Sequence, residues 1–345
     1  MIINFGSMLR GEKNNMKIGI LDQGPITKGH TPEQALQFIE ELAILADSLG
    51  YSRMWMAEHH NTQWYVSTAP EILAAHLAAK TKQIRIGTGG IMMMHYSPFK
   101  MAEVFKTLAG LNPGRIDFGV GRAPGGDPVA TRALAEGRSQ MGMDMYEKLS
   151  TTLRLMSDRK PNSSIYDSVI ASPTNIKLPE AFLLGSTGNS AIQAGKMGVG
   201  YAFAHFFSGE MHKEVFEAYR TYFEPSYFME KPLINVTYSV TVAPTVDEAE
   251  FYAKPLDIWR LNFLKGQIGQ ILSPEEAAEV QFTEMDKMTV KQNRNIHLVG
   301  TAVQVADRLR ADQEYFGFEE VMFNLNQHGQ KSRLQCVQLL AKELL

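Results

Sequence analysis

Short apolar runs alternate with amphipathic helical segments from residue 16 almost to the end of the 345-residue chain. This alternation is typical of βαβ units, whose strands lie parallel in one sheet. The runs that have the length and composition of strands cover residues 16–23, 53–60, 84–93, 115–123, 181–186, 200–206, 233–243 and 319–326. Because eight parallel strands, each followed by a helix, close into a barrel, the pattern predicts an α/β fold of the (β/α)8 TIM-barrel type.

The length of the chain suits one domain of this type, since a single α/β barrel often has more than about 250 residues. We expect residues 16–345 to form the barrel domain and residues 1–15 to be an N-terminal extension, because the periodic pattern begins only at Met16. The stretch 246–300 is longer than one helix needs, and it predicts a helical insertion late in the barrel, with two or three helices and an exposed turn at 272–274.

Local signals predict the bounds of several segments. Thr31 and Pro32 have the residue types of a helix start, and Gly50 has that of a helix end. We expect a long helical region over about residues 129–157. The polar connector 158–180 is predicted to be a mobile loop or lid over the barrel mouth.

Composition excludes several classes of protein. The formal net charge is −3, whereas nucleic-acid binding calls for a basic patch or stripe. No apolar stretch approaches the roughly 20 residues of a membrane span, and residues 1–15 lack the apolar region of a signal peptide. Cys336 is the only cysteine, so no intrachain disulfide can form and a reducing compartment is expected. We therefore predict a cytoplasmic protein with no nucleic-acid or membrane partner.

Polar side chains stand at the ends of several predicted strands. In a TIM barrel the carboxyl ends of the strands meet at one face, where active sites lie. The residues that this rule brings to the barrel mouth are Glu58, His59, His60, His95, Arg122, Ser186 and His205. Their convergence predicts a functional site, and a histidine suits proton transfer because its ordinary pKa lies near neutral pH.

A phosphate site is expected where the strand 181–186 ends. Glycine, small hydroxyl residues and a helix start follow one another from Gly185 to Ser190, so backbone N–H groups and hydroxyls come together at a helix N-terminus. Arg122 could add a bidentate contact to the phosphate. The nearby stretch 119–125 does not match the dinucleotide fingerprint, because Pro124 stands where the third glycine is required.

Two hydrolase classes are weighed against these residues. Glu58, His59, His60, His95 and His205 include metal-ligand types, but the chain has no H-E-x-x-H motif. It also lacks the G-x-S-x-G elbow of a serine hydrolase at Gly185–Gly188. No metal ligand is therefore assigned, although a metal-dependent barrel hydrolase stays an alternative.

The order of motifs over residues 54–128 resembles the luciferase-like flavin monooxygenases. E-H-H follows the second strand, G-T-G-G-I forms the third, and S-P, P-G-R-I-D-F-G and G-R-A-P-G come after it. The later G-S-T-G-N (185–189) and H-L-V-G-T (297–301) extend the resemblance over most of the chain. What the resemblance implies is a TIM barrel that binds FMN at its mouth, usually as a homodimer, and uses reduced flavin and O2 to oxidise a small organic substrate. A separate NAD(P)H flavin reductase often supplies the reduced flavin.

The resemblance also implies roles for particular residues. It makes His59 the catalytic histidine with His60 beside it, and places a non-proline cis peptide at Gly89-Gly90. The residues that it implies for the cofactor site are Glu58, Gly89, Gly90, Gly121, Arg122, Gly185, Ser186, Thr187 and Asn189. Bacterial luciferase has a glutamate where this chain has Gly185, so we expect the phosphate site to have a different balance of charge.

Other functions stay open beside an FMN-dependent monooxygenase. An F420-dependent oxidoreductase on the same fold would show a different absorption spectrum. A non-catalytic flavin-binding protein would bind oxidised flavin without substrate-dependent O2 consumption, and a metal-dependent hydrolase would contain bound metal.

Overall fold

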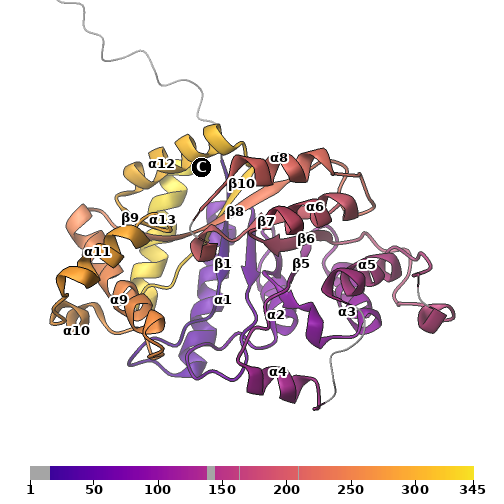
Figure 1. Cartoon of the computed structure of the whole chain (residues 1–345), viewed down its shortest axis with the longest axis horizontal. Coiled ribbons are helices and arrows are strands. Elements are labelled where there is room, and N and C mark those ends of the chain that lie inside the picture. Colours follow the sequence, from indigo (N-terminus) through magenta and orange to yellow (C-terminus); the bar gives the residue numbers. More distant parts are fainter. Residues whose placement is uncertain (1–15, 138–143, 163, 209) are drawn as a thin grey trace, which may run out of the picture.

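The computed structural model describes residues 16–137, 144–162, 164–208 and 210–345, so the predicted extension 1–15 lies outside the described residues. Its barrel is built from β1 (Lys17–Asp22), β2 (Arg53–Met56), β3 (Arg85–Thr88), β5 (Ile116–Gly121), β6 (Glu180–Gly185), β7 (Gly200–Phe203), β8 (Ile234–Val242) and β10 (Glu320–Asn324). All neighbouring strands are parallel, and β10 closes the barrel by pairing with both β1 and β8. The predicted closed eight-stranded fold is confirmed (Figure 1).

The third barrel strand has a break at two glycines. The predicted strand 84–93 consists of β3 and the short β4 (Ile91–Met92), with Gly89 and Gly90 between them. Both pieces pair with β5, but their register differs by one residue, since Gly87 lies opposite Asp117 and Ile91 opposite Val120. The Gly89-Gly90 peptide bond is cis, as predicted.

Helices surround the barrel in the places that the alternation requires. They are α1 (Pro32–Leu49), α2 (Pro70–Lys80), α3 (Pro98–Leu111), α4 (Pro128–Leu134), α5 (Met145–Met156), α6 (Gly188–Met197), α7 (His205–Ser208), α8 (Lys213–Thr221), α9 (Val246–Leu264), α10 (Pro274–Ala278), α11 (Glu284–Asn293), α12 (Ala302–Phe316) and α13 (Gln330–Leu344), with 3-10 turns η1 (Met93–His95) and η2 (Ser164–Tyr166). Thr31 caps α1 with a capping box and Gly50 ends it with φ +89°, as its sequence predicts. No described helix is long and apolar enough to cross a bilayer.

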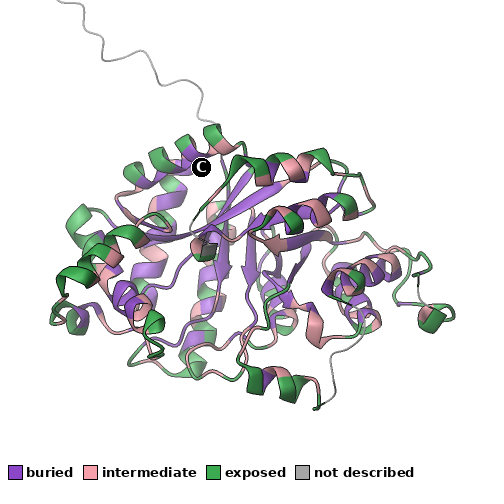
Figure 2. Cartoon of the chain, viewed as in Figure 1, coloured by how far each residue is buried: buried purple, intermediate pink, exposed green. Residues whose placement is uncertain are grey.

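The two faces of each strand have different partners, and Figure 2 shows most of the strand residues as buried. On β8 the side chain of Tyr238 points outward, because its hydroxyl donates to Asp312 of α12 at 3.0 Å. Alternation along the strand then directs Asn235, Thr237 and Ser239 into the barrel. All of β8 is buried, so this strand combines an apolar outer face with a polar inner one.

An ion-pair network closes the barrel interior at the end opposite the mouth. Arg53 pairs with Asp117 at 2.6 Å and with Glu320 at 2.7 Å, and Arg85 pairs with Asp117 and with Glu180. The Trp55 indole also donates to Asp117 at 2.8 Å. Buried charges are stable only when such partners satisfy them. These paired side chains fill this end of the barrel. A ligand must enter from the opposite end.

The insertion 246–300 is helical as predicted, but its last residues are not. It contains α9, α10 and α11, with a turn before α10, and then β9 (His297–Gly300). This strand pairs with β8 from Ser239 to Val242, and Ser239 is the last residue of β8 that also pairs with β10. The sequence prediction missed β9 because its four residues are too short to show a period.

Two connections differ from their predictions. The described part of the helical region 129–157, which leaves out residues 138–143, contains two helices instead of one: α4 ends at Leu134, and Glu136 and Gly137 have φ values of +52° and +71°. The lid prediction for 158–180 is wrong. This connector leads from a helix to the start of β6, and Lys177 lies against Gly114 in the turn before β5. It therefore lies at the end of the barrel opposite the mouth.

Candidate active site

The barrel mouth is formed by the segments that follow the strands, on the side of the molecule where α4 lies in Figure 1. Small residues occupy the inner face at this level, notably Ala57, Gly89 and Gly121. A Cβ atom on Gly121 would meet nothing closer than Met92 Sδ at 3.8 Å, whereas one on Gly89 would lie 2.7 Å from Leu21. The floor of the mouth is therefore backbone without side chains, which lets a flat ligand approach it closely.

Glu58 ties the end of β2 to the segment after the two glycines. Its side chain is fully buried, and Oε2 accepts a hydrogen bond from the Met92 backbone N–H at 2.8 Å. Oε1 accepts from the Tyr96 hydroxyl at 2.8 Å and contacts His60 Nε2 at 2.7 Å. Three protein partners thus occupy this carboxylate, and it holds His60 and the β4 segment in place.

His59 lies beside the floor and is stacked on an aromatic ring. Its imidazole and the Tyr65 ring are 4.5 Å apart and inclined by 19°, and the backbone N–H donates to the Ser67 carbonyl at 2.9 Å. Nδ1 is buried without a hydrogen-bond partner among the described residues. Burial, followed by the charge of His60, lowers the pKa of His59 to about 4. The expectation of a pKa near neutral pH is therefore wrong for His59, which is a neutral imidazole at pH 7.

The loop after β5 packs over the histidines. The His60 backbone N–H donates to the Gly125 carbonyl at 2.7 Å, and His95 Nε2 contacts the Pro124 carbonyl at 2.8 Å. A Cβ atom on Gly125 would lie 2.9 Å from Met92, and this glycine has φ +67°. The centres of the His60 and His95 rings lie 6.0 Å apart, so the sequence correctly predicted that these two residues converge.

The predicted phosphate residues come together where β5 and β6 end. Val120 lies opposite Leu183 in the sheet, so the next positions bring Arg122 level with Gly185. Thr187 caps α6, and Asn189 lies in its first turn with Nδ2 3.4 Å from the Tyr146 hydroxyl. Among the residues that the structure describes, neither the exposed Arg122 guanidinium nor the Ser186 hydroxyl has a hydrogen-bond partner. The helix N-terminus and these free donors suit an anion.

Gly185 has a packing reason beyond its place in the motif. A Cβ atom on this residue would lie 2.3 Å from Ser190 Oγ and 2.6 Å from Ser190 Cβ. Ser190 Oγ in turn donates to the Thr187 carbonyl at 2.8 Å and lies 3.1 Å from the Tyr201 hydroxyl. Ser190 and Tyr201 thus occupy the space in which a larger residue at 185 would begin.

His205 does not join the other histidines. It is buried, its Nε2 contacts the Asn295 carbonyl at 3.0 Å, and its ring packs against Tyr238 on the outer face of β8. No three His, Cys, Asp or Glu side chains of the described residues lie close enough together to hold a metal ion.

Sequence reasoning missed two residues of the mouth. Tyr96 follows His95 directly and could have been found from that position, but its bond to Glu58 depends on the turn at η1. Arg260 lies in the helical insertion on α9, where its charge reaches Tyr65. Nothing in the local pattern separates Arg260 from a solvent-exposed helix residue.

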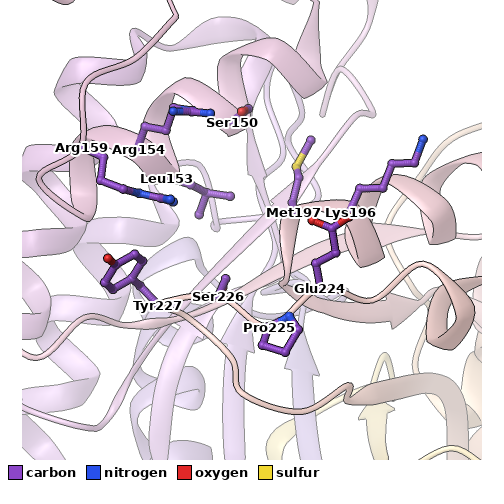
Figure 3. A pocket seen from close by; sticks show the side chains of 10 residues that line it. All are labelled: Ser150, Leu153, Arg154, Arg159, Lys196, Met197, Glu224, Pro225, Ser226 and Tyr227. Carbon is purple, nitrogen blue, oxygen red and sulfur yellow. The ribbon is translucent and has the colours of Figure 1, made fainter.

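A separate cavity of about 530 Å³ lies away from the mouth, between the C-terminal parts of α5 and α6. Figure 3 shows Arg159 and Tyr227 on one side of it and Lys196 and Glu224 on the other. The Arg159 guanidinium lies 4.9 Å from the centre of the Tyr227 ring. None of the predicted site residues lines this cavity.

Comparison with known proteins gives consistent matches. Residues 16–320 match the family described as luciferase-like monooxygenase. The Bacillus subtilis protein YceB is 37% identical over 328 residues, which cover 95% of this chain and 99% of YceB. The N-acetyl-S-alkylcysteine monooxygenase of B. subtilis is 34% identical over 296 residues, or 85% of this chain and 88% of that protein.

Solved structures share the whole fold. The apo-MsnO8 structure has a TM-score of 0.87 and 32% identity, and the match covers 96% of this chain and 98% of that one. The FMN complex of the oxygenating constituent of 3,6-diketocamphane monooxygenase from Pseudomonas putida has a TM-score of 0.69 and 19% identity, covering 95% and 97%. An F420-dependent secondary alcohol dehydrogenase has a TM-score of 0.66 and 16% identity, covering 96% and 99%. The last two similarities show the fold alone.

Proposed function

The chain belongs to the luciferase-like monooxygenase family, and on that premise we propose that it is an FMN-dependent monooxygenase that uses reduced flavin and O2 to oxidise a small organic substrate. The observation that carries the proposal is the pairing of a bare glycine floor with a free anion site at one side of the same mouth. A flat ring system joined to a phosphate has these two requirements.

The anion site supports a phosphate. The Arg122 guanidinium has no partner within the described part of the chain, and Ser186 and Thr187 stand at the N-terminus of α6, where backbone N–H groups point outward. Asn189 adds an exposed amide in the first turn. Position 185 is a glycine, so no carboxylate there competes with a ligand anion for Arg122.

The floor supports the ring. Gly89, Gly90 and Gly121 present backbone alone, and a Cβ atom on Gly90 would lie 2.9 Å from the Gly121 nitrogen. His59 Nδ1 and Ser239 Oγ are buried polar atoms without partners among the described residues. A bound heterocycle would offer them hydrogen bonds, which buried polar groups need.

The protein groups around the floor bind and orient the ligands, and they exclude water. FMN, when bound, supplies the redox chemistry that activates O2. His59 is neutral at pH 7, so it acts as a hydrogen-bonding group there rather than as a positive charge. Tyr65 holds the His59 ring by stacking, and Glu58 holds His60. We assign His59 and His60 as the catalytic residues and Glu58 as a positioning residue of the cofactor site.

Two further features belong to the proposal. The reduced flavin is supplied by a separate NAD(P)H flavin reductase, and the protein works as a homodimer. Both follow from the resemblance to the family, and sedimentation of the purified protein tests the dimer.

The test is an absorption titration of the purified protein with FMN and, in parallel, with F420. FMN should bind with a saturable change in its visible bands. Arg122→Ala should raise the Kd for FMN at least tenfold, a loss of about 1.4 kcal/mol of binding free energy, as expected when one charge-assisted contact is removed. Arg132→Ala, an exposed arginine on α4, is the matched control and should bind as the parent does.

Three results would decide against the proposal. If the protein binds F420 but not FMN, its cofactor is F420 and the FMN assignment is wrong. Flavin binding without substrate-dependent O2 consumption across a substrate panel would indicate a non-catalytic flavin protein. Absence of flavin binding in both redox states, with stoichiometric metal in the same sample, would favour a hydrolase.

A further inference from the structure

Arg260 is a partly buried cation of the helical insertion. It lies on α9 three residues after the buried Asp257, so the two side chains share one side of the helix. Its Nη1 is buried, and among the described residues it has no hydrogen bond and no ion pair. Burial lowers the pKa of Arg260 to about 10, so the side chain stays charged at neutral pH. Charges that lose contact with water are normally paired, and the described residues offer Arg260 no such pair.

The carboxylate whose charge acts on Arg260, that of Asp257, is already engaged by another arginine. Asp257 accepts from Arg294 through both oxygens, at 2.6 and 2.9 Å, and Arg294 also pairs with Glu250 at 2.6 Å. His297 lies 3.8 Å from Asp257, and burial lowers the pKa of His297 to about 4, so it adds no charge at pH 7. The charge of Arg260 is therefore left without an anion of its own.

Arg260 lies near Tyr65, because their chain neighbours Trp259 and Trp64 line the same pocket of about 300 Å³. Burial raises the pKa of Tyr65 to about 12, and the nearby positive charge of Arg260 partly opposes that rise. Tyr65 is the residue on which His59 stacks. A neutral tyrosine hydroxyl cannot compensate a guanidinium, so a ligand anion is the partner that this position lacks.

The position of Arg260 separates it from the proposed phosphate site. Around the barrel the strands follow the order β1, β2, β3, β5, β6, β7, β8 and β10. A side chain that reaches from α9, after β8, toward Tyr65, after β2, lies over β10 and β1. This is the side opposite β5 and β6, where Arg122 and Ser186 lie. One phosphate cannot serve both sites.

We propose that Arg260 binds a carboxylate of the substrate, so that the enzyme acts on small organic acids whose reacting group lies toward His59. A planar carboxylate matches the two parallel N–H donors of a guanidinium. A dianion such as phosphate fits less well, because Arg260 is one cation with Asp257 nearby. The direction of the reacting group rests on the proposed function, whereas the carboxylate contact does not require flavin.

The test is calorimetric titration of the full-length protein with hexanoate and with its uncharged analogue hexanamide. The parent should bind hexanoate more tightly than hexanamide. Arg260→Met should weaken hexanoate binding at least tenfold and leave hexanamide binding unchanged, and Arg260→Lys should retain part of the preference. Arg154→Met, a partly exposed arginine beside the distant cavity, is the control and should behave as the parent. Trp64 and Trp259, the neighbours of Tyr65 and Arg260, provide a fluorescence readout of the same event.

Each outcome decides the proposal separately from the flavin assignment. Equal hexanoate affinity in the parent and Arg260→Met, no preference of the parent for hexanoate, or tighter binding of inorganic phosphate than of hexanoate at Arg260 would overturn it. Loss of FMN affinity in Arg260→Met would assign the residue to the cofactor and also overturn it. Ligand-free Arg260→Met should melt no lower than the parent, because it loses an unpaired charge; a lower Tm would reveal a structural partner. A parent that binds hexanoate through Arg260 but not FMN would refute only the proposed function.

Discussion

The backbone at Gly185, where β6 ends, has no room for a side chain. A Cβ atom there would lie 2.3 Å from Ser190 Oγ and 2.6 Å from Ser190 Cβ, which is closer than real Cβ contacts allow. Ser190 cannot yield freely, because its hydroxyl completes the capping box of Thr187 and touches Tyr201. Replacing Gly185 with alanine should therefore push Ser190 away from the N-terminus of α6.

The size of the effect follows from the contacts that are lost. Overpacking by a methyl group costs about 1–3 kcal/mol, and loss of the cap hydrogen bonds adds about 1 kcal/mol. We expect Gly185→Ala to lower the free energy of unfolding by about 2–4 kcal/mol. Displacement of Thr187 and Ser186 should also weaken FMN binding by about tenfold, or 1.4 kcal/mol.

Urea denaturation followed by circular dichroism measures the change, together with the FMN titration. Gly188→Ala is the matched control, because nothing lies within 4 Å of a Cβ atom there and the residue is already helical. It should be neutral or stabilising by up to about 1 kcal/mol. In a Ser190→Gly background, Gly185→Ala should cost much less, with a coupling energy of about 1–3 kcal/mol.

The reasoning would be refuted by either of two results. Gly185→Ala could prove as stable as Gly188→Ala, which would mean that Ser190 has another place to go. The double variant could instead show additive losses, which would place the strain somewhere other than the contact with Ser190.

Two further predictions concern the other side of the mouth. Glu58→Gln replaces a carboxylate that has three polar partners by an amide, whose NH2 group must face at least one of them. The free energy of unfolding should therefore fall by about 2–3 kcal/mol in urea denaturation, and an unchanged midpoint would contradict the buried network. His59 should titrate near pH 4 in histidine-labelled NMR, because burial lowers its pKa from 6.5 to about 4. The unfolded chain takes up that proton first, so stability should fall as the pH drops from about 6.5 to 4, by at most about 3 kcal/mol, and less in His59→Asn. A His59 signal that titrates above pH 6 would exclude its burial.

Much of the architecture could be predicted from local patterns. The alternation of strands and helices is a property of neighbouring residues, and so are the caps of α1 at Thr31 and Gly50. The rule that strand ends share one face then brought His59, His60, His95 and Arg122 to the mouth, where the structure places them. His205 also follows a strand, but its side chain turns outward toward Tyr238. Strand ends predict the level of a residue in the barrel better than the direction of its side chain.

The failures have a common physical cause. Segment 158–180 looked like a lid because it is polar, but polarity does not say at which end of the barrel a loop lies. The break of a long helix at Glu136 and Gly137 depends on two backbone conformations that favour no distinctive residue types apart from glycine. Strand β9 has no period of its own and is defined only by pairing with β8.

The sequence by itself determined the barrel, the level of the polar residues and the resemblance to a family, because these depend on periodicity and on short motifs. Only the tertiary structure decided which charges are paired. Asp257, Arg260 and Arg294 lie in one helical insertion, and nothing in their spacing shows that Arg294 occupies the carboxylate and that Arg260 Nη1 is left without a hydrogen bond among the described residues. Burial likewise set the neutral state of His59. Both properties arise from the surroundings that distant segments create, since the energy of a charge depends on what replaces water around it.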